Sequence, residues 1–313
     1  MNVSISGRDS RAWVEVDLAA VIDNARTVAR TAGTRLLPIV KANAYGLGAV
    51  AVSKALEAVD PWGFGVATPE EGAELRAAGI ARPILILTPA SADRFDFYRA
   101  HRLTPALDTL AAVTAWTSSG GGPFHLEIDT GMSRTGVRWD AVDSLRGALE
   151  TGDIEAAFTQ FHSADLPNDT AERQRERFLA AVDRLPRRPP LLHAANTAAT
   201  LRDKQFAFDL VRPGIFLYAG GRPVVTVRAR VVSVRRVRRG DTVSYGGTWT
   251  APRDTTIVTL GAGYADGIRR CVGNRGHVLV HGTACPIVGV VTMDLMMAAR
   301  FIRRSAATGA PIP

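Results

Sequence analysis

The chain has 313 residues, 46% hydrophobic and 22% charged, a composition that excludes a disordered protein. Its length exceeds the usual size of one domain, so we expect a large domain and a smaller one. The formal net charge of +8 arises mostly from scattered arginines. Between Arg228 and Arg239 the arginines roughly alternate with valines, as in a strand with one solvated face, so we predict no nucleic-acid partner. The positive charge also suits anionic substrates or cofactors.

Neither a disulfide framework nor a membrane anchor is predicted. The two cysteines, Cys271 and Cys285, are too few for such a framework and have no metal-ligand spacing, so we expect no metal. No apolar run approaches the length of a membrane span. Residues 1–10 are polar and lack the apolar region of a signal peptide. We therefore expect a cytoplasmic protein with no membrane partner.

The first two thirds of the chain alternate between apolar runs and helical patterns. Residues 12–16 alternate like a short strand, and Asp17 is a candidate N-cap for a helix that reaches about Arg30. About eight strand–helix units in this part predict a (β/α)8 barrel, with a doubly wound sheet as the alternative. The predicted strands are 36–40, 63–66, 84–87, 103–107, 124–128, 154–161, 191–195 and 208–211, with helical patterns at 68–78, 108–116, 139–150 and 170–184.

The pattern changes near residues 220–223, a Gly-Gly-Arg-Pro sequence. Beyond it, short alternating segments separated by turn residues predict a mostly β second domain, with strands at 224–234, 256–260, 276–280 and 286–291. We assign residues 18–222 to the barrel, and residues 11–17 with 223–313 to the β domain. After Met297 the strand pattern is lost, so this domain is expected to be incomplete at its C-terminal end.

An unusual lysine ends the first predicted barrel strand. Lys41 interrupts an apolar run, with Tyr45 four residues later and Gly46 and Gly48 beyond it. A lysine amine that is partly shielded from water has a lowered pKa and can form a Schiff base. The tyrosine can lie against a flat ring, and the glycines allow close approach of backbone to a ligand. Taken alone, the lysine can equally be a solvated charge.

Other polar groups follow later strands, where a barrel places its reactive side chains. Arg134 follows the fifth strand, Asn196 and Thr197 follow the seventh, and Arg212 follows the eighth. Asn196 and Thr197 either cap the next helix or bind a phosphate at its N-terminus. In the second case, backbone amides of Gly214 and Ile215 would approach the same phosphate.

These stretches resemble the alanine racemases in order and identity. Residues 40–46, Val-Lys-Ala-Asn-Ala-Tyr-Gly, resemble the motif whose lysine binds pyridoxal 5'-phosphate in that family. The segment ending at Arg134 resembles the loop whose arginine faces the phenolic oxygen of the cofactor and the substrate. The segment starting at Arg212 resembles the one whose arginine faces the pyridine nitrogen. The resemblance covers about residues 11–297 and implies that Lys41, Tyr45, Arg134, Asn196, Thr197, Arg212, Gly214 and Ile215 bind the cofactor.

An arginine at the pyridine nitrogen has a chemical consequence. A guanidinium is effectively always protonated and does not readily give the ring a proton. The ring is then a weaker electron sink than one that faces a carboxylate. A carbanion that stays at Cα is reprotonated there, which favours racemisation over transamination.

Racemisation requires proton transfer on both faces of Cα. Lys41 can serve one face, and the resemblance assigns the other to Tyr264 of the partner subunit, in a homodimer with shared active sites. Free tyrosine has a pKa of about 10, so such a base needs cationic neighbours near neutral pH. Residues 292–294 resemble the segment in which Met293 contacts the substrate and Asp294 supports the entrance.

Three positions test the resemblance locally. Glu127 stands where the family often has a lysine modified to a carbamate, so it supplies a negative charge near Arg134 directly; a glutamate on a polar strand face is the alternative. Gln160 replaces a histidine that connects the pyridine-facing arginine to the catalytic tyrosine, and it cannot carry charge. His162 lies two residues further, on the same strand face, and is a candidate substitute.

The resemblance implies racemisation of a small amino acid, most directly L-alanine to D-alanine for peptidoglycan. Serine racemisation or a broader specificity remains an alternative. So do a related decarboxylase and a catalytically weak homologue that only binds pyridoxal phosphate.

Overall fold

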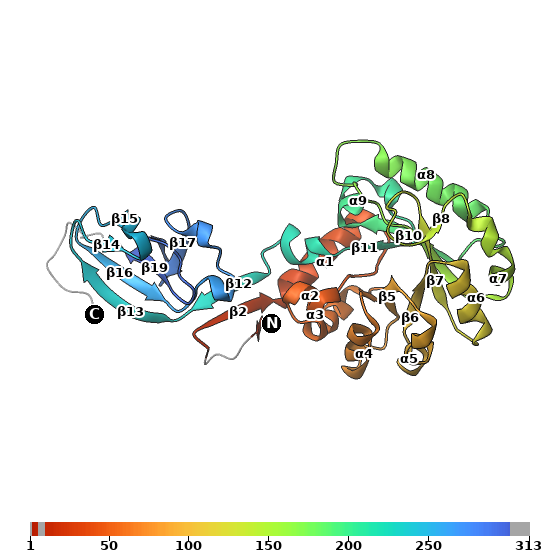
Figure 1. Cartoon of the computed structure of the whole chain (residues 1–313), viewed down its shortest axis with the longest axis horizontal. Coiled ribbons are helices and arrows are strands. Elements are labelled where there is room, and N and C mark those ends of the chain that lie inside the picture. The colour runs from red at the N-terminus through yellow and green to blue at the C-terminus, as the bar shows by residue number, and fades with distance from the viewer. Residues whose placement is uncertain (1, 6–9, 301–313) are drawn as a thin grey trace. The chain divides into compact units, whose positions relative to one another are not determined.

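The computed structural model describes residues 2–5 and 10–300. The chain forms two compact units, labelled by element in Figure 1. The first contains Val16–Val225, and the second combines the segment that ends at Glu15 with the chain from Thr226 onward. Among the described residues, no helix is both long and apolar enough to cross a membrane.

The first unit is a parallel barrel, as predicted, and not a doubly wound sheet. Beyond β3, Ile39 pairs with Gly65 of β4, so the first and last strands of the sheet meet. Regular pairing ends early in the first predicted strand because Pro38 lacks a donor N–H. The strand order is β3 (Arg35–Leu36), β11 (Leu210–Arg212), β10 (Leu191–Asn196), β9 (Ile154–Phe158), β7 (Phe124–Asp129), β6 (Thr104–Leu107), β5 (Ile84–Pro89), β4 (Phe64–Val66), with β8 (Val137–Arg138) beside β7.

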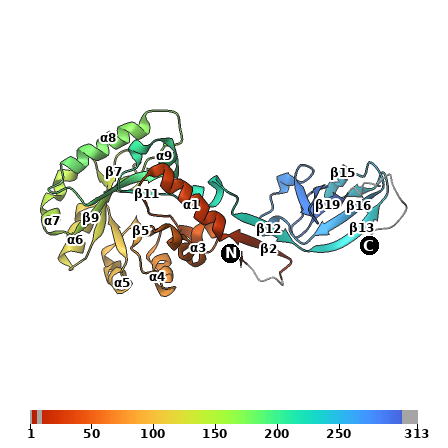
Figure 2. The ribbon, with the colours of Figure 1, turned by 180° about the vertical axis from the view of Figure 1, so that it is seen from behind.

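Helices connect these strands, and Figure 2 shows α4, α5 and α6 on the outer side of the sheet. The predicted helix 139–150 is instead a 3₁₀ turn, Val142–Leu145, followed by a short helix. The helices are α1 (Leu18–Ala32), α2 (Lys41–Gly46), α3 (Ala49–Leu56), α4 (Pro69–Ala77), α5 (Phe95–Ala100), α6 (Leu110–Ser118), α7 (Arg146–Thr151), α8 (Thr170–Asp183) and α9 (Thr197–Arg202).

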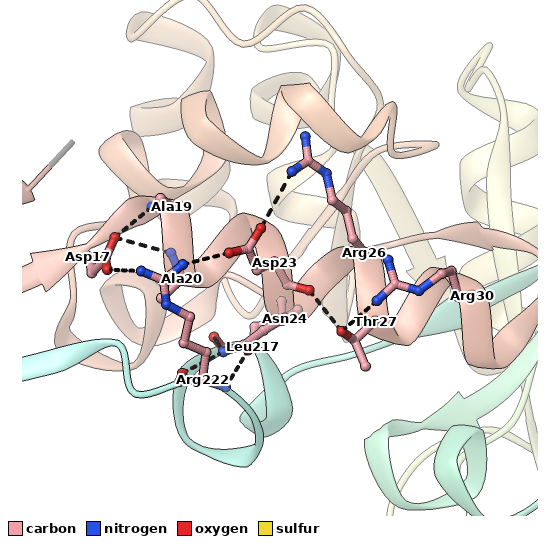
Figure 3. Close-up of polar contacts among 10 residues, drawn as sticks. All are labelled: Asp17, Ala19, Ala20, Asp23, Asn24, Arg26, Thr27, Arg30, Leu217 and Arg222. Carbon is pink, nitrogen blue, oxygen red and sulfur yellow. Dashed lines mark hydrogen bonds and ion pairs between the residues drawn. The ribbon is translucent and has the colours of Figure 1, made fainter.

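Helix α1 anchors the chain that leaves the last barrel strand (Figure 3). Asp17 caps the helix as predicted, accepting hydrogen bonds from the amides of its second and third residues at 3.0 and 3.1 Å. Asn24 is buried, and its side-chain amide donates to the carbonyls of Leu217 and Arg222. The Arg222 guanidinium pairs with Asp17 at 3.0 Å and Asp23 at 2.6 Å. These contacts fix the segment that follows Arg212.

The second unit is mostly β, as predicted. Its core includes Val258, Leu260, Val291 and Ala298. Three antiparallel strands pair in the order β13 (Val231–Val237), β16 (Thr255–Leu260), β19 (Met296–Arg300). Two hairpins pair β14 (Thr242–Val243) with β15 (Trp249–Thr250) and β17 (His277–Val280) with β18 (Thr283–Pro286), and a further sheet has the order β1 (Asn2–Ile5), β2 (Ala12–Asp17), β12 (Val225–Ala229).

Three sequence expectations for this part were wrong. The predicted strand 224–234 is two strands interrupted at Arg230, and valines of β13 such as Val234 are exposed, so this strand does not have one buried face. Residues 287–291 form no strand, because Gly289 adopts a φ of 76° against the backbone of β14. Strand β19 extends to Arg300, since the fully buried Ala298 and Ala299 need no alternation. The rest of the expected incomplete end, 301–313, lies outside the described residues.

Candidate active site

A cavity of about 460 Å³ lies at the carboxyl ends of the barrel strands, within the size range of small-molecule sites. Among the described residues that line it, Lys41 is exposed, not partly shielded as expected, since it lies just beyond the strand end. The cavity brings together most of the sequence-predicted residues: Lys41, Tyr45, Glu127, Arg134, Gln160, Asn196, Thr197, Arg212, Gly214 and Ile215.

The backbone after Lys41 forms a left-handed turn. Residues 42–45 have φ values between 51° and 58°. For L residues this conformation costs roughly 1–2 kcal/mol each. The Glu71 carboxylate holds the turn, because it accepts hydrogen bonds from the amides of Ala42 at 2.6 Å and Ala67 at 2.7 Å. The strained turn is thereby tied to the start of α4.

Tyr45 leaves this turn and forms one wall of the cavity. Its ring lies 4.8 Å from that of Tyr218, whose hydroxyl donates to the carbonyl of Ile39 at 2.8 Å. A Cβ on Gly214 would meet the Tyr45 hydroxyl at 2.5 Å, so this position requires a glycine. Burial raises the pKa of Tyr45, which therefore remains a protonated donor at neutral pH.

The ends of β10 and β11 meet on the opposite side of the glycine. Asn196 caps α9 through a hydrogen bond from the amide of Ala199 at 3.0 Å, so the cap is one role the structure shows for it. The hydroxyl of Thr197 accepts a hydrogen bond from the amide of Gly214 at 3.0 Å. A hydroxyl and a backbone amide therefore lie at the same point of the cavity wall.

Arg212 is the most strongly anchored side chain of the site. It is 4% exposed and donates five hydrogen bonds. One terminal nitrogen contacts Nδ1 of His193 at 2.6 Å, and the other contacts the carbonyl of Thr159 at 2.7 Å. Burial lowers the pKa of Arg212 to about 10, so the guanidinium stays charged at neutral pH and only donates.

Gln160 takes part in this anchoring, whereas His162 does not. The side-chain oxygen of Gln160 accepts a hydrogen bond from Arg212 at 3.0 Å. His162 is exposed, contacts Ser163 at 2.6 Å and does not line the cavity. Strand β9 ends at Phe158, so the two-residue alternation that suggested His162 does not extend that far.

Glu127 places a carboxylate in the cavity wall. It is 4% exposed, and its Oε1 accepts a hydrogen bond from the Thr135 hydroxyl at 2.9 Å. Its buried Oε2 has no hydrogen-bond partner among the described residues. Burial raises the pKa of Glu127 more than the nearby charges of Arg134 and Arg212 lower it. This unpaired oxygen leaves a position where a cation or donor would be stabilised.

The remaining predicted residues form a second group in the second unit. The amides of Tyr264 and Ala265 donate to the carbonyls of Thr292 and Met293, both at 3.0 Å. Nearby, Arg11 pairs with Asp294 at 2.9 Å and with Asp266. Tyr264 and Met293 remain 42% and 54% exposed. Two segments predicted separately in the sequence therefore lie together.

Sequence reasoning missed several residues of the site. Phe158 and Asp165 line the cavity, while His193 and Glu71 hold its parts in place. A histidine inside an apolar strand was a detectable signal for His193. Glu71 was detectable as the third helical residue of a capping box with Thr68, but not as the partner of a turn 29 residues away.

Comparisons with known proteins agree with this geometry. Residues 16–223 match the family Alanine racemase, N-terminal domain, and residues 224–307 match Alanine racemase, C-terminal domain. The alanine racemase of Deinococcus radiodurans is 38% identical over 301 residues, 92% of this chain and 85% of that protein. The structure of alanine racemase from E. faecalis is similar with a TM-score of 0.85 at 28% identity, covering 96% of this chain and 88% of that one. Alanine racemase from Bartonella henselae, solved with covalently bound pyridoxal phosphate, has a TM-score of 0.80 at 28% identity, with 93% and 86% covered. The chain belongs to the alanine racemase family.

Proposed function

We propose that this protein converts L-alanine to D-alanine with pyridoxal 5'-phosphate. Residues 18–222 would bind the cofactor, and residues 11–17 with 223–313 would supply the rest of the site. The observation that carries the proposal is Arg212, a buried guanidinium fixed by five hydrogen bonds in the cavity that Lys41 also lines. An arginine in this place favours racemisation over transamination, because it does not readily give up a proton.

The residues present fit the cofactor. Lys41 offers an amine for covalent attachment, and Arg212 offers a donor for the ring nitrogen. Thr197 and Gly214 offer a hydroxyl and an amide for the phosphate, with Asn196 and Ile215 beside them. Because a Cβ at Gly214 would meet the Tyr45 hydroxyl, the glycine keeps that donor close to the cavity wall.

The protein groups would then divide the proton transfers. When bound, pyridoxal phosphate supplies the electron sink that makes the Cα hydrogen of alanine acidic. The Lys41 amine would exchange a proton with one face of Cα, and Tyr264 of the partner subunit with the other. Arg134 would hold the substrate carboxylate with the help of Met293, and the Glu127 carboxylate would orient Arg134. Gln160 would support Arg212 and Asp294 the entrance.

We further propose a homodimer that works in the cytoplasm and supplies D-alanine for peptidoglycan. Exposed apolar side chains on β13 support a subunit contact, among them Val231, Val232 and Val234, each at least 46% exposed. The two cysteines, Cys271 and Cys285, are unpaired, which agrees with a reducing compartment.

The test uses hybrid dimers purified with two different affinity tags. A hybrid of Lys41→Ala and Tyr264→Phe chains retains one intact shared site, so we expect about half of the wild-type alanine racemisation. Each parent variant alone should be inactive. As a control, a hybrid of wild-type with a Lys41→Ala/Tyr264→Phe chain should be inactive, because both of its sites are broken. The reverse pattern would refute shared sites, and a wild-type protein that forms no D-alanine would refute the function.

A further inference from the structure

A file of buried polar side chains leads from Arg212 into the barrel, away from the cavity. Nδ1 of His193 lies 2.6 Å from the guanidinium, and Nε2 of His193 lies 2.9 Å from Nδ1 of His125. Nε2 of His125 in turn lies 3.3 Å from a carboxylate oxygen of Glu155. The four residues come from β11, β10, β7 and β9. Neither histidine nor Glu155 lines the cavity at Lys41.

The proton positions in this file follow from its two ends. A guanidinium only donates, so Nδ1 of His193 must accept. A neutral imidazole carries one proton, so His193 is protonated on Nε2 and donates to His125. His125 is then also protonated on Nε2, and it donates to Glu155. Each link therefore has one direction, and the carboxylate at the far end determines which nitrogen faces Arg212.

The surroundings keep both rings neutral and fixed. Both histidine side chains are fully buried. Burial and the charge of Arg212 hold the pKa of His193 well below its usual value. Burial also lowers the pKa of His125 more than Glu155 raises it. His193 stacks on Phe158 with ring centroids 4.9 Å apart, and the His125 ring lies 5.3 Å from that of Trp62.

We propose that His125 and Glu155 are positioning residues for Arg212, because they select the His193 tautomer that accepts from the guanidinium. With the other tautomer, an N–H of His193 would face an N–H of Arg212, and the guanidinium would turn away from that ring. The role of Arg212 at the cofactor rests on the proposed function, whereas the tautomer of His193 does not.

The outer end of the file can be changed without touching the site. Glu155 is 30% exposed and lines a separate cavity of about 370 Å³ at the start of β9. Glu155→Leu removes the acceptor, whereas Glu155→Gln keeps a carbonyl oxygen that can accept from His125. The pair therefore separates the loss of the acceptor from the loss of the charge.

The first measurement is histidine-selective ¹H–¹⁵N NMR on the full chain, which distinguishes the two tautomers and the charged ring. In the wild-type protein we expect both His125 and His193 to be neutral and protonated on Nε2 between about pH 5.5 and 8. A charged His193, or one protonated on Nδ1, would overturn the proposal even if Glu155→Leu failed to fold. This result does not depend on catalysis, so it is separate from the proposed function.

The second measurement compares the variants with cofactor bound. In Glu155→Leu we expect a mixed His193 tautomer, a shifted visible absorbance maximum, and a kcat for alanine lowered roughly tenfold with KM little changed. Glu155→Gln should keep the wild-type tautomer and stay within about twofold of the wild-type kcat. A purely structural role would lower the melting temperature of Glu155→Leu but leave tautomer, absorbance and kcat unchanged, and that outcome would refute the proposal.

Discussion

The missing side chain at Gly214 determines where the Tyr45 hydroxyl lies. In Gly214→Ala the added Cβ would meet that hydroxyl at 2.5 Å, so Tyr45 would move and the wall of the cavity would change. We expect pyridoxal phosphate to bind roughly tenfold more weakly, a loss of about 1.4 kcal/mol. Absorbance titration of the cofactor into the protein without cofactor measures this change.

Two further variants control for this result. Adding Tyr45→Phe to Gly214→Ala removes the clashing oxygen and leaves the nearest ring carbon at 3.3 Å, so part of the affinity should return. Gly147→Ala introduces a Cβ with nothing within 4 Å and should bind the cofactor normally. Weak binding in Gly147→Ala, or full binding in Gly214→Ala, would contradict the steric argument.

Glu127 makes a pH-dependent contribution to stability because burial raises its pKa. A raised pKa means that the folded state binds the proton more tightly than the unfolded state. The stabilisation is therefore fully present below the unfolded pKa and is lost as the pH rises through the folded pKa. The neutral variant Glu127→Gln escapes this loss. We expect its melting temperature, relative to wild type, to increase from pH 4 to pH 8.

An exposed carboxylate with the opposite shift provides the comparison. The hydrogen bond from Arg138 lowers the pKa of Asp140, so this group stabilises the folded state at higher pH. The melting temperature of Asp140→Asn relative to wild type should therefore fall over the same pH range. A pH-independent difference for Glu127→Gln would show that its carboxyl is not perturbed by folding.

At the scale of the element, the turn of residues 42–45 stores strain beside Lys41. Ala42 is exposed and has a φ of 51°, which glycine adopts without cost. Ala42→Gly should relieve roughly 1–2 kcal/mol of strain but lose part of this to the flexibility of the unfolded chain. We expect a net increase of about 0.5–1 kcal/mol in the free energy of unfolding, measured with urea.

The same substitution in a right-handed helix should have the opposite sign. Ala111 is an exposed residue of α6, and Ala111→Gly should lower the free energy of unfolding by about 0.5–1 kcal/mol. If both variants were destabilised equally, residue 42 would not be in the left-handed conformation in solution.

At the scale of the molecule, the alternation of strands and helices was sufficient to predict the barrel and the small β domain. The cavity residues followed because parallel strands bring their carboxyl ends together, so Lys41, Arg134 and Arg212 were predictable from strand order and family resemblance. Tertiary contacts were not. Nothing local to Glu155 indicates that it reaches His125 across neighbouring strands.

Strand assignment failed where burial replaced alternation. Ala298 and Ala299 are buried on both faces, so their strand lacks the two-residue pattern that identifies an exposed sheet. Conversely, the valines of β13 alternate with polar residues but remain exposed, because the pattern does not show whether another element covers the strand. The conformation of residues 42–45 was equally hidden, since alanine favours a right-handed helix.

The left-handed turn has a consequence for the chirality of the chain itself. A right-handed helix suits L residues, and its mirror image, with φ near 57°, suits D residues in the same way. Ala42, with φ 51° and ψ 48°, therefore occupies the backbone well that D-alanine prefers. Inverting this single stereocentre by chemical synthesis would relieve strain, although the same inversion within α1 or α8 would disrupt the helix. Beside Lys41, the protein holds an L-alanine in the conformation natural to its enantiomer.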